Sequence, residues 1–525
     1  MDRILRDIGR LVAVRSVMGD AKPGKPFGDD VAAAVDVAAR IAGELGFESS
    51  NVDGYVLEVN LNDKPDALGI MCHLDVVPEG NGWTTPPYVA DVRDGRIYGR
   101  GTADNKGPAV CALYALKCVK DMGVALTKNV RLMLGTNEEN GSSDLTEYFK
   151  RRSVPPVSFS PDAAFPVYNI EKGRYGKYFA AGWADAGDAA AAGPAPGAKR
   201  GGSTGSKAGS QDPGAHDGSC AARKICCVDA GIALNVVPDV ATAVVEGFRA
   251  GDLLPYLKAA EEKTGVKFSA KSVGGAAGAG AADGAPGAGL PGQGGPAPDQ
   301  VGAGVEVLDT DGTARFEITA KGVGTHASFP EEGNNALTAL VSLLNSMPFA
   351  DCAAVRALWG VGEVFPHGDT AGVAAGVAMS DEESGPLTLS LDILHMDEKG
   401  IKGGFDARCP IISDEKNTSK VLAAALAKHG LLVEDTEMVL PHYVPADSPF
   451  IKTLLRVYEE ETGLPGECVS MGGGTYVHDI PGSVAFGAAF PDTETNAHAA
   501  DEYSVIDELA ANVRIYVKVI LEMCK

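Results

Sequence analysis

Residues 68–78 read Leu-Gly-Ile-Met-Cys-His-Leu-Asp-Val-Val-Pro, an apolar run that leads into a histidine and an aspartate two positions apart. An almost uninterrupted apolar run of this length is typical of a buried central strand. In α/β sheets, ligands gather beyond the carboxyl ends of the strands, which is where His73 and Asp75 fall. The stretch therefore predicts an α/β sheet with functional side chains at the end of one central strand.

The segments around this strand alternate between helical and extended patterns. Apolar spacing predicts helices over 29–45 and 107–122, and strands over 55–60, 68–74, 130–134 and 157–159. Strand–helix–strand alternation favours an α/β fold, here a mixed sheet flanked by helices. Three of the expected strands end at acidic or imidazole side chains. The sequence thus places several chemically active groups at one edge of the sheet.

Composition limits the classes of partner. The 525 residues carry a formal net charge of −24, so the surface repels nucleic acid and anionic membranes, and we expect neither as a partner. The N-terminus has no apolar signal core and no run is long enough to span a membrane, which favours a cytoplasmic location. Ten cysteines without a Cys-x-x-Cys pair argue against a thiolate zinc site and fit reduced thiols.

The chain is long enough for about two to four domains. We expect a discontinuous catalytic domain formed by residues 1–173 and 441–525, with an α+β lid domain inserted at 174–440. Two stretches within the lid, near 184–222 and 274–304, consist mainly of Gly, Ala, Pro and Ser. Such composition buries too little apolar surface to offset the entropy of ordering, so the sequence predicts disordered insertions there.

Two histidines and three acids distributed along the chain can hold two divalent ions. The candidates are His73, Asp104, Glu139, Asp162 and His498. We expect Asp104 to bridge the ions, with His73 and Asp162 completing one site and Glu139 and His498 the other. Asp75 lies on the same side of its strand as His73 and can fix the imidazole tautomer. Glu138 is next to a ligand but points elsewhere, which suits a general base acting on water.

Each motif alone has a simpler interpretation. A lone His-x-Asp is more often a hydrogen-bonded pair than a ligand, and the acids at 138 and 139 could merely begin a helix. Asp162 after Pro161 could be a turn residue, and His498 could serve packing. Their joint occurrence at several strand ends favours the metal site.

Four segments that carry these residues resemble the M20 metallopeptidase family, and within it the PepV-like (Xaa-His, carnosinase-type) dipeptidase branch. The segments are Cys72–Pro78, Gly99–Gly107, Gly135–Glu139 and Phe159–Asp162. The resemblance implies the ligand set above with two divalent ions, zinc first and manganese as the alternative. It also implies that Glu138 is the base, that Asp75 orients His73, and that the peptide bond after Asp104 is cis.

The same resemblance assigns roles in the lid. His326, in the segment Gly324–Ser328, matches a histidine that reaches across to stabilise the oxyanion. Asn235 and Arg408 match lid positions near the substrate, where the Arg408 fork suits a terminal carboxylate. The loop of Gly472, Gly473 and Gly474 resembles one whose backbone amides hold that carboxylate. A lid long enough to supply His326 in the same chain suggests a monomer.

These inferences predict a metal-dependent dipeptidase that cleaves short free-amine peptides through a metal-bridging hydroxide. Two rivals remain open. One is an N-acyl amino acid hydrolase that uses the same metal chemistry, and the other is a catalytically silent binding protein on the same scaffold. All of the expected site residues are present, which disfavours the silent protein. Side-chain preference and the native metal cannot be read from the residues.

Overall fold

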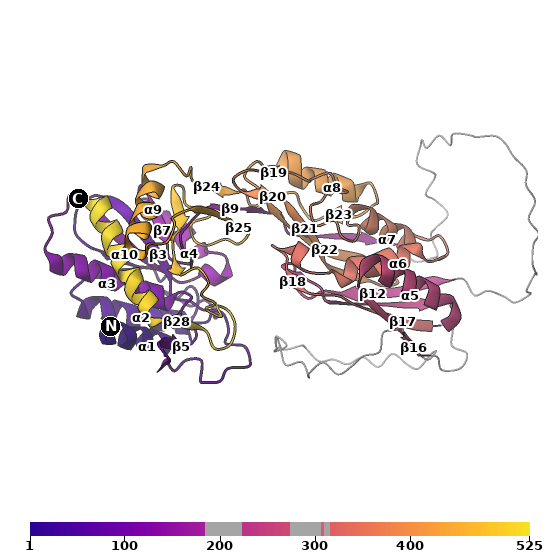
Figure 1. Cartoon of the computed structure of the whole chain (residues 1–525), viewed down its shortest axis with the longest axis horizontal. Coiled ribbons are helices and arrows are strands. Elements are labelled where there is room, and N and C mark those ends of the chain that lie inside the picture. The colour runs from indigo at the N-terminus through magenta and orange to yellow at the C-terminus, as the bar shows by residue number, and fades with distance from the viewer. Residues whose placement is uncertain (184–222, 274–305, 309–314) are drawn as a thin grey trace, which may run out of the picture.

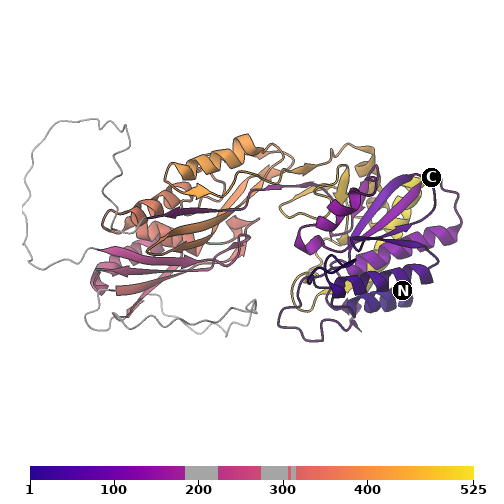
Figure 2. The ribbon, with the colours of Figure 1, turned by 180° about the vertical axis from the view of Figure 1, so that it is seen from behind.

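The computed structural model describes residues 1–183, 223–273, 306–308 and 315–525. The two insertions predicted to be disordered, near 184–222 and 274–304, lie outside the described residues. The described chain forms two lobes, and both termini lie in the same lobe (Figure 1; Figure 2 shows the reverse side). We call the lobe built on the sheet of β3 (Asp66–His73) the first lobe, and the lobe built on the sheet of β22 (Gly400–Cys409) the second lobe.

The first lobe contains a mixed nine-stranded sheet in the order β1-β2-β6-β3-β7-β26-β9-β24, with β25 paired to β9. Its strands are β1 (Ser49–Val52), β2 (Val56–Asn60), β3, β6 (Asn129–Gly135), β7 (Ser158–Ser160), β9 (Val167–Glu171), β24 (His442–Tyr443), β25 (Cys468–Met471) and β26 (Ser483–Ala485). The central strands β6, β3 and β7 are parallel, so their carboxyl ends share one edge. This confirms the predicted α/β class and the strands around residues 56–60, 68–73 and 130–134.

Helices and short strands complete the first lobe. They are α1 (Asp2–Val12), α2 (Asp29–Glu44), α3 (Lys106–Met122), α4 (Ser143–Phe149), α9 (Pro449–Thr462), α10 (Ile506–Cys524), the 3₁₀ turn η1 (Glu138–Asn140), β4 (Asp91–Arg93), β5 (Arg96–Tyr98), β8 (Ala163–Ala164), β27 (Ala488–Ala489) and β28 (Tyr503–Val505). Gly123 ends α3 in the left-handed conformation, with φ 63°. Ser448 caps α9 by accepting from the Ile451 amide at 3.3 Å.

Both ends of the chain build one core. The largest apolar cluster of the first lobe draws its buried residues from 4–167 and again from 444–524. The C-terminal helix α10 packs on α3 and on β3. Burial of this apolar surface is the main force that returns the distant C-terminal segment to the sheet. The first lobe is therefore discontinuous in sequence, as predicted for the fold class.

The second lobe has a mostly antiparallel sheet in the order β16-β15-β17-β14-β12-β21-β22-β11-β23, with β10 paired to β22. Its strands are β10 (Gly173–Arg174), β11 (Lys177–Gly182), β12 (Lys224–Ala230), β14 (Val240–Glu246), β15 (Lys267–Ser272), β16 (Glu306–Leu308), β17 (Arg315–Lys321), β21 (Thr388–Met396), β22 and β23 (Leu432–Val433). In the described residues the sheet is accompanied by four α-helices, which are α5 (Ala250–Thr264), α6 (Ala336–Ser346), α7 (Ala353–Val364) and α8 (Lys420–Ala427). Two short helical turns, η2 (Pro330–Glu332) and η3 (Glu415–Ser419), and two two-stranded ladders complete the lobe: β13 (Val236–Val237) with β18 (Thr325–His326), and β19 (Ser380–Asp381) with β20 (Gly385–Pro386).

The second lobe has its own core, formed by buried residues between 175 and 438. Strand β14 shows why the lobe folds this way, because its buried and partly exposed residues alternate along the strand. That alternation is the pattern of a sheet with one face on a core. No helix in the described part of the chain combines the length and apolar character needed to cross a membrane.

Gly135 lies where β6 ends and the segment carrying Glu138 begins. A Cβ atom at this position would collide with the Tyr476 hydroxyl and the Asp144 carboxylate, which contact each other there. We expect Gly135→Ala to lower the free energy of unfolding by about 1–3 kcal/mol, the usual cost of overpacking. Chemical denaturation measures this. The matched control is Gly43→Ala in α2, where a Cβ meets open space; equal destabilisation by both variants would contradict the account.

Candidate active site

Five predicted ligands come from five different connections in the first lobe. His73 ends β3, Glu139 lies in η1 directly after β6, and Asp162 lies between β7 and β8. Asp104 immediately precedes α3, and His498 lies in the loop between β27 and β28. Because β6, β3 and β7 are parallel neighbours, the first three reach the same edge of the sheet.

The Asp104 carboxylate lies between the two imidazoles. Its Oδ1 is 2.8 Å from His73 Nε2, and its Oδ2 is 2.9 Å from His498 Nε2. The peptide bond that follows Asp104 is cis, as the family resemblance implied. One carboxylate therefore presents each of its oxygens to a different histidine, which is the arrangement a bridging ligand requires.

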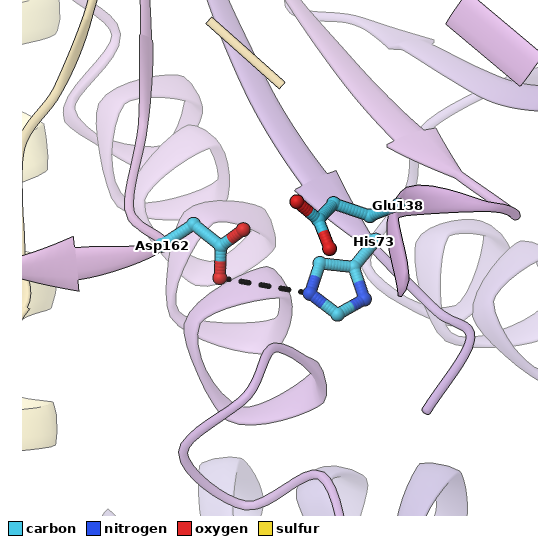
Figure 3. Close-up of side chains that lie close together, drawn as sticks. All are labelled: His73, Glu138 and Asp162. Atoms are coloured by element: carbon cyan, nitrogen blue, oxygen red, sulfur yellow. Dashed lines mark ion pairs between the residues drawn. The ribbon is translucent and has the colours of Figure 1, made fainter. Parts of the chain in front are cut away.

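The remaining acids surround these histidines. Asp162 Oδ1 is 3.6 Å from His73 Nε2, and Glu139 Oε2 is 3.1 Å from His498 Nε2. Figure 3 shows the Asp162 carboxylate directed at the His73 ring, with the Glu138 carboxylate also turned toward that ring. Donor atoms of His73, Glu138 and Asp162 all lie within 4.8 Å of one another. The expectation that Glu138 points away from the ligands is therefore wrong, because its carboxylate lies among them.

Asp75 contacts its neighbours differently from the expectation. His73 Nδ1 is 2.9 Å from the backbone carbonyl of Asp75 but 3.5 Å from its carboxylate. The carboxylate instead accepts hydrogen bonds from the backbone amides of Glu138 and Glu139, each at 3.2 Å. Asp75 therefore fixes His73 mainly through its carbonyl, while its side chain fastens η1 beside the histidine. Sequence spacing alone could not distinguish these two partners.

Burial and crowding shift the pKa values of the site. Burial, reinforced by the charge of Asp162, raises the pKa of Glu138 well above its ordinary value. Burial would also raise the pKa of Asp104, but hydrogen bonds from His498 and His73 hold it far below its usual range. Hydrogen bonds from His498 to Asp104 and Glu139 raise the pKa of His498 to about 11. The cluster thus carries an excess of negative charge that stabilises cations.

Two observations test whether the residues fit divalent metal ions. The first is the placement of the two Asp104 oxygens toward separate histidines. The second is Glu139 Oε1, which is buried and has no hydrogen-bond partner among the described residues. An unpaired buried carboxylate oxygen is costly unless a cation satisfies it. Imidazole nitrogens with carboxylate oxygens are donors suited to zinc or manganese, so the residues fit.

Glu502 holds the Asp104 loop, although the sequence analysis did not single it out. Its fully buried Oε1 accepts from the backbone amides of Gly101 at 3.0 Å, Ala103 at 2.9 Å and Asp104 at 3.0 Å. Its Oε2 pairs with Arg100 Nη1 at 2.6 Å. The only signal in the sequence was an acid four positions after His498.

We expect Glu502→Gln to destabilise the first lobe by about 3–5 kcal/mol, because the buried Arg100 guanidinium loses its compensating charge. The displaced Asp104 loop should also lower metal affinity. Thermal unfolding and metal content after dialysis measure the two effects. Glu494→Gln is the control, since Glu494 is exposed in the preceding loop. A Glu502 variant as stable as this control would contradict the assignment.

His326 and Asn235 lie together in the second lobe. His326 pairs across β18 with Val236 of β13, and the Ala327 amide donates to the Asn235 carbonyl at 2.9 Å. Strand β18 lies on the side of the second lobe that faces the first (Figure 1). Within the described residues, neither His326 nor Asn235 forms a hydrogen bond or an ion pair with any of the five predicted ligands. The structure thus brings these two residues to each other but not to the cluster.

Arg408 joins the second lobe to the glycine loop. Its guanidinium forms a two-pronged pair with Asp406, at 2.6 and 3.1 Å, and its Nη1 donates to the Gly472 carbonyl. The residue that follows Gly472, Gly473 and Gly474 fixes the end of this loop, because the Thr475 amide donates a hydrogen bond to Glu171 Oε1 at 3.0 Å. Arg408 is buried in this pairing rather than at the surface. The structure therefore places Arg408 against the glycine loop, and the substrate-binding roles of both stay predictions.

The chain is similar to known proteins over almost its whole length. The family model described as peptidase family M20/M25/M40 matches residues 69–522. The chain is 33% identical to YtjP of Bacillus subtilis (strain 168), over 99% of this chain and 97% of that protein. It is 30% identical to the Beta-Ala-Xaa dipeptidase of Lactobacillus delbrueckii subsp. lactis, over 100% of this chain and 96% of that protein.

Solved structures share the fold. The aminoacylhistidine dipeptidase from Vibrio alginolyticus has a TM-score of 0.53 at 13% identity, covering 99% of this chain and 96% of its own. The M20 family metallo-carboxypeptidase Sso-CP2 from Sulfolobus solfataricus has a TM-score of 0.51 at 16% identity, covering 99% of each chain.

The family match and the similar dipeptidases define the chain as a hydrolase, and the site gathers residues that could hold metal ions. The chain belongs to peptidase family M20/M25/M40. Use of divalent metals is a property of the metallopeptidases of this family. The predicted family, fold class and enzyme class are thereby confirmed.

Proposed function

We propose that the protein is a dipeptidase that hydrolyses the peptide bond of short peptides with a free α-amine. The observation that carries the proposal is the Asp104 carboxylate shared between His73 and His498, at 2.8 and 2.9 Å. The 30% identity to a Beta-Ala-Xaa dipeptidase over the whole chain supports the substrate class. We assign the catalytic domain to residues 1–173 and 441–525 and the lid to 174–440.

Two divalent ions, zinc first and manganese as the alternative, would be held by His73 with Asp162 and by Glu139 with His498, with Asp104 shared. When bound, such ions polarise the scissile carbonyl and lower the pKa of water. Glu138, whose carboxylate lies among the donors, takes the proton from the attacking water. The same carboxyl then gives that proton to the departing amine, which restores the base.

We assign the second lobe to substrate positioning. His326 of β18 would approach the cluster when the lobes close and stabilise the oxyanion, and Asn235, which directly precedes β13, would lie near the substrate. Arg408 and the amides of Gly472, Gly473 and Gly474 would hold the carboxylate at the substrate C-terminus. Closure over a short substrate excludes water and longer chains. Because this chain carries all of these groups itself, we propose that a monomer is active.

The test compares a dipeptide with its acylated counterpart. Purified protein supplied with zinc or manganese is assayed with alanyl-alanine and with N-acetylalanine, and released amino acid is quantified. We expect cleavage of the dipeptide and little cleavage of the acetylated compound. The reverse preference would replace the proposal with an N-acyl amino acid hydrolase, and no turnover of either would favour a binding protein.

A further inference from the structure

A cavity of about 300 Å³ adjoins the ligand cluster and is not used by the mechanism above. It lies between the segment of Asp104, the segment of Asp162 and the first two turns of α10. Pockets for small molecules span about 300–1,000 Å³, so this one has room for a single side chain rather than a longer peptide. Two of the predicted ligands, Asp104 and Asp162, form part of its wall.

Six alanines line the cavity. They are Ala103, Ala163, Ala164, Ala488, Ala489 and Ala497. Alanine offers neither charge nor a hydrogen-bonding group, so these residues provide space and an apolar lining. Selectivity must therefore come from the few polar groups that face the cavity.

Two polar side chains of α10 line the cavity one turn apart. Glu508 is half-buried, and its Oε1 accepts from the Thr493 hydroxyl at 2.7 Å. Asn512 is 1% exposed, and its Nδ2 donates to the Ala488 carbonyl at 3.0 Å. Asn512 Oδ1 has no hydrogen-bond partner among the described residues. A buried amide oxygen without a donor needs a partner, which a water molecule or a donor group of a ligand can supply.

Glu508 and Asn512 Oδ1 present acceptors to the cavity, and the Thr495 hydroxyl can donate or accept. A carboxylate has about four lone-pair sites, so Glu508 retains capacity beyond its bond to Thr493. Asp104 and Asp162 also line the cavity, but their charge is assigned to the metal ions, which leaves Glu508 as the negative charge available to a ligand. The guanidinium of Arg96, which also acts on Glu508, lies over the Tyr503 ring, 4.3 Å from its centroid. The cavity therefore favours a ligand that donates hydrogen bonds and carries positive charge.

We propose that this cavity receives the side chain of the substrate's N-terminal residue, and that Glu508 and Asn512 select a side chain ending in an ammonium or guanidinium group. The inference rests on the proposed dipeptidase function and adds a substrate class to it. A lysine-like chain would run along the alanine wall and place its charged end between the Glu508 carboxylate and Asn512 Oδ1. An apolar chain of equal length would leave both acceptors unpaired.

The test uses two substrates whose N-terminal side chains share the same unbranched four-carbon chain. Lysyl-alanine and norleucyl-alanine differ at the end of the side chain, where only lysine has an ammonium group, and both have a free α-amine. We expect kcat/KM to favour lysyl-alanine by at least about tenfold, the size of one hydrogen bond to a charged group. Glu508→Gln keeps the shape but removes the charge, and it should bring that ratio close to one. Asp507→Asn, the exposed neighbouring acid, controls for net charge and should leave the ratio unchanged.

The outcomes separate this inference from the function on which it rests. Turnover of both substrates without a lysine preference, or a preference that survives in Glu508→Gln, would overturn the subsite and leave the dipeptidase proposal intact. Absence of turnover would contradict the dipeptidase proposal. Calorimetric titration with lysine and with norleucine would then still decide the subsite, which predicts tighter binding of lysine to wild type and loss of that difference in Glu508→Gln.

Discussion

Glu138→Gln should lower kcat for dipeptide hydrolysis by about 10²–10⁴-fold, the usual contribution of a positioned general base. The amide keeps the size of the side chain but cannot accept the proton of the attacking water. Because Glu138 is assigned as the base and not as a ligand, metal content after dialysis should remain at the wild-type value. Steady-state kinetics combined with elemental analysis measures both quantities in one preparation.

Glu139→Gln is the matched control for this prediction, since it changes the adjacent residue in the same way. Glu139 approaches His498 at 3.1 Å and is assigned as a ligand, so this variant should lose metal as well as activity. A Glu138 variant that retains more than about a tenth of wild-type kcat would contradict its role as the base. Loss of metal in that variant, equal to the loss in Glu139→Gln, would make Glu138 a ligand instead.

Asp104→Asn should reduce both metal content and activity, the latter by about 100-fold or more. Changes in groups that merely orient a ligand already cost about 10–100-fold, and Asp104 is assigned as a direct ligand of both ions. Its two oxygens lie 2.8 Å from His73 and 2.9 Å from His498, and an amide leaves only one oxygen, without charge, to serve both sides. Metal titration of the chelator-treated variant measures the loss of affinity.

The control for Asp104→Asn is Asp162→Asn. Asp162 approaches only His73 among the two histidines, at 3.6 Å, so its loss should weaken one ion and spare the other. The account predicts fewer than two ions in both variants, with the lower content in Asp104→Asn. Equal loss in the two variants would contradict the bridging assignment of Asp104.

The sequence predicted the site well where chemistry follows directly from strand ends. His73, Glu139 and Asp162 follow β3, β6 and β7, and the parallel pairing of those strands brings them to one edge. Local apolar patterns were sufficient to place these strands. His498 was proposed from its residue type and from the return of the helix–strand pattern after residue 442, and the family resemblance implied the same ligand. No local pattern specifies which distant loop packs beside Asp104.

The supports of the site could not be predicted in this way. Glu502 accepts hydrogen bonds from three backbone amides that lie about 400 positions earlier in the chain. Asp144 accepts a hydrogen bond from the hydroxyl of Tyr476, which belongs to the C-terminal segment. Such contacts depend on how whole segments pack, not on neighbouring residues. The Asp75 carboxylate was expected to contact the His73 imidazole, but it accepts hydrogen bonds from the backbone amides of η1. This difference arises for the same reason.

The most direct test of the account is a metal titration of chelator-stripped protein, in which dipeptide hydrolysis and bound metal are followed together. The account predicts negligible hydrolysis without metal and activity that rises with added zinc or manganese until two ions are bound per chain. Full activity in the metal-free protein, or saturation of binding at two ions with no hydrolysis of any free-amine dipeptide, would contradict it.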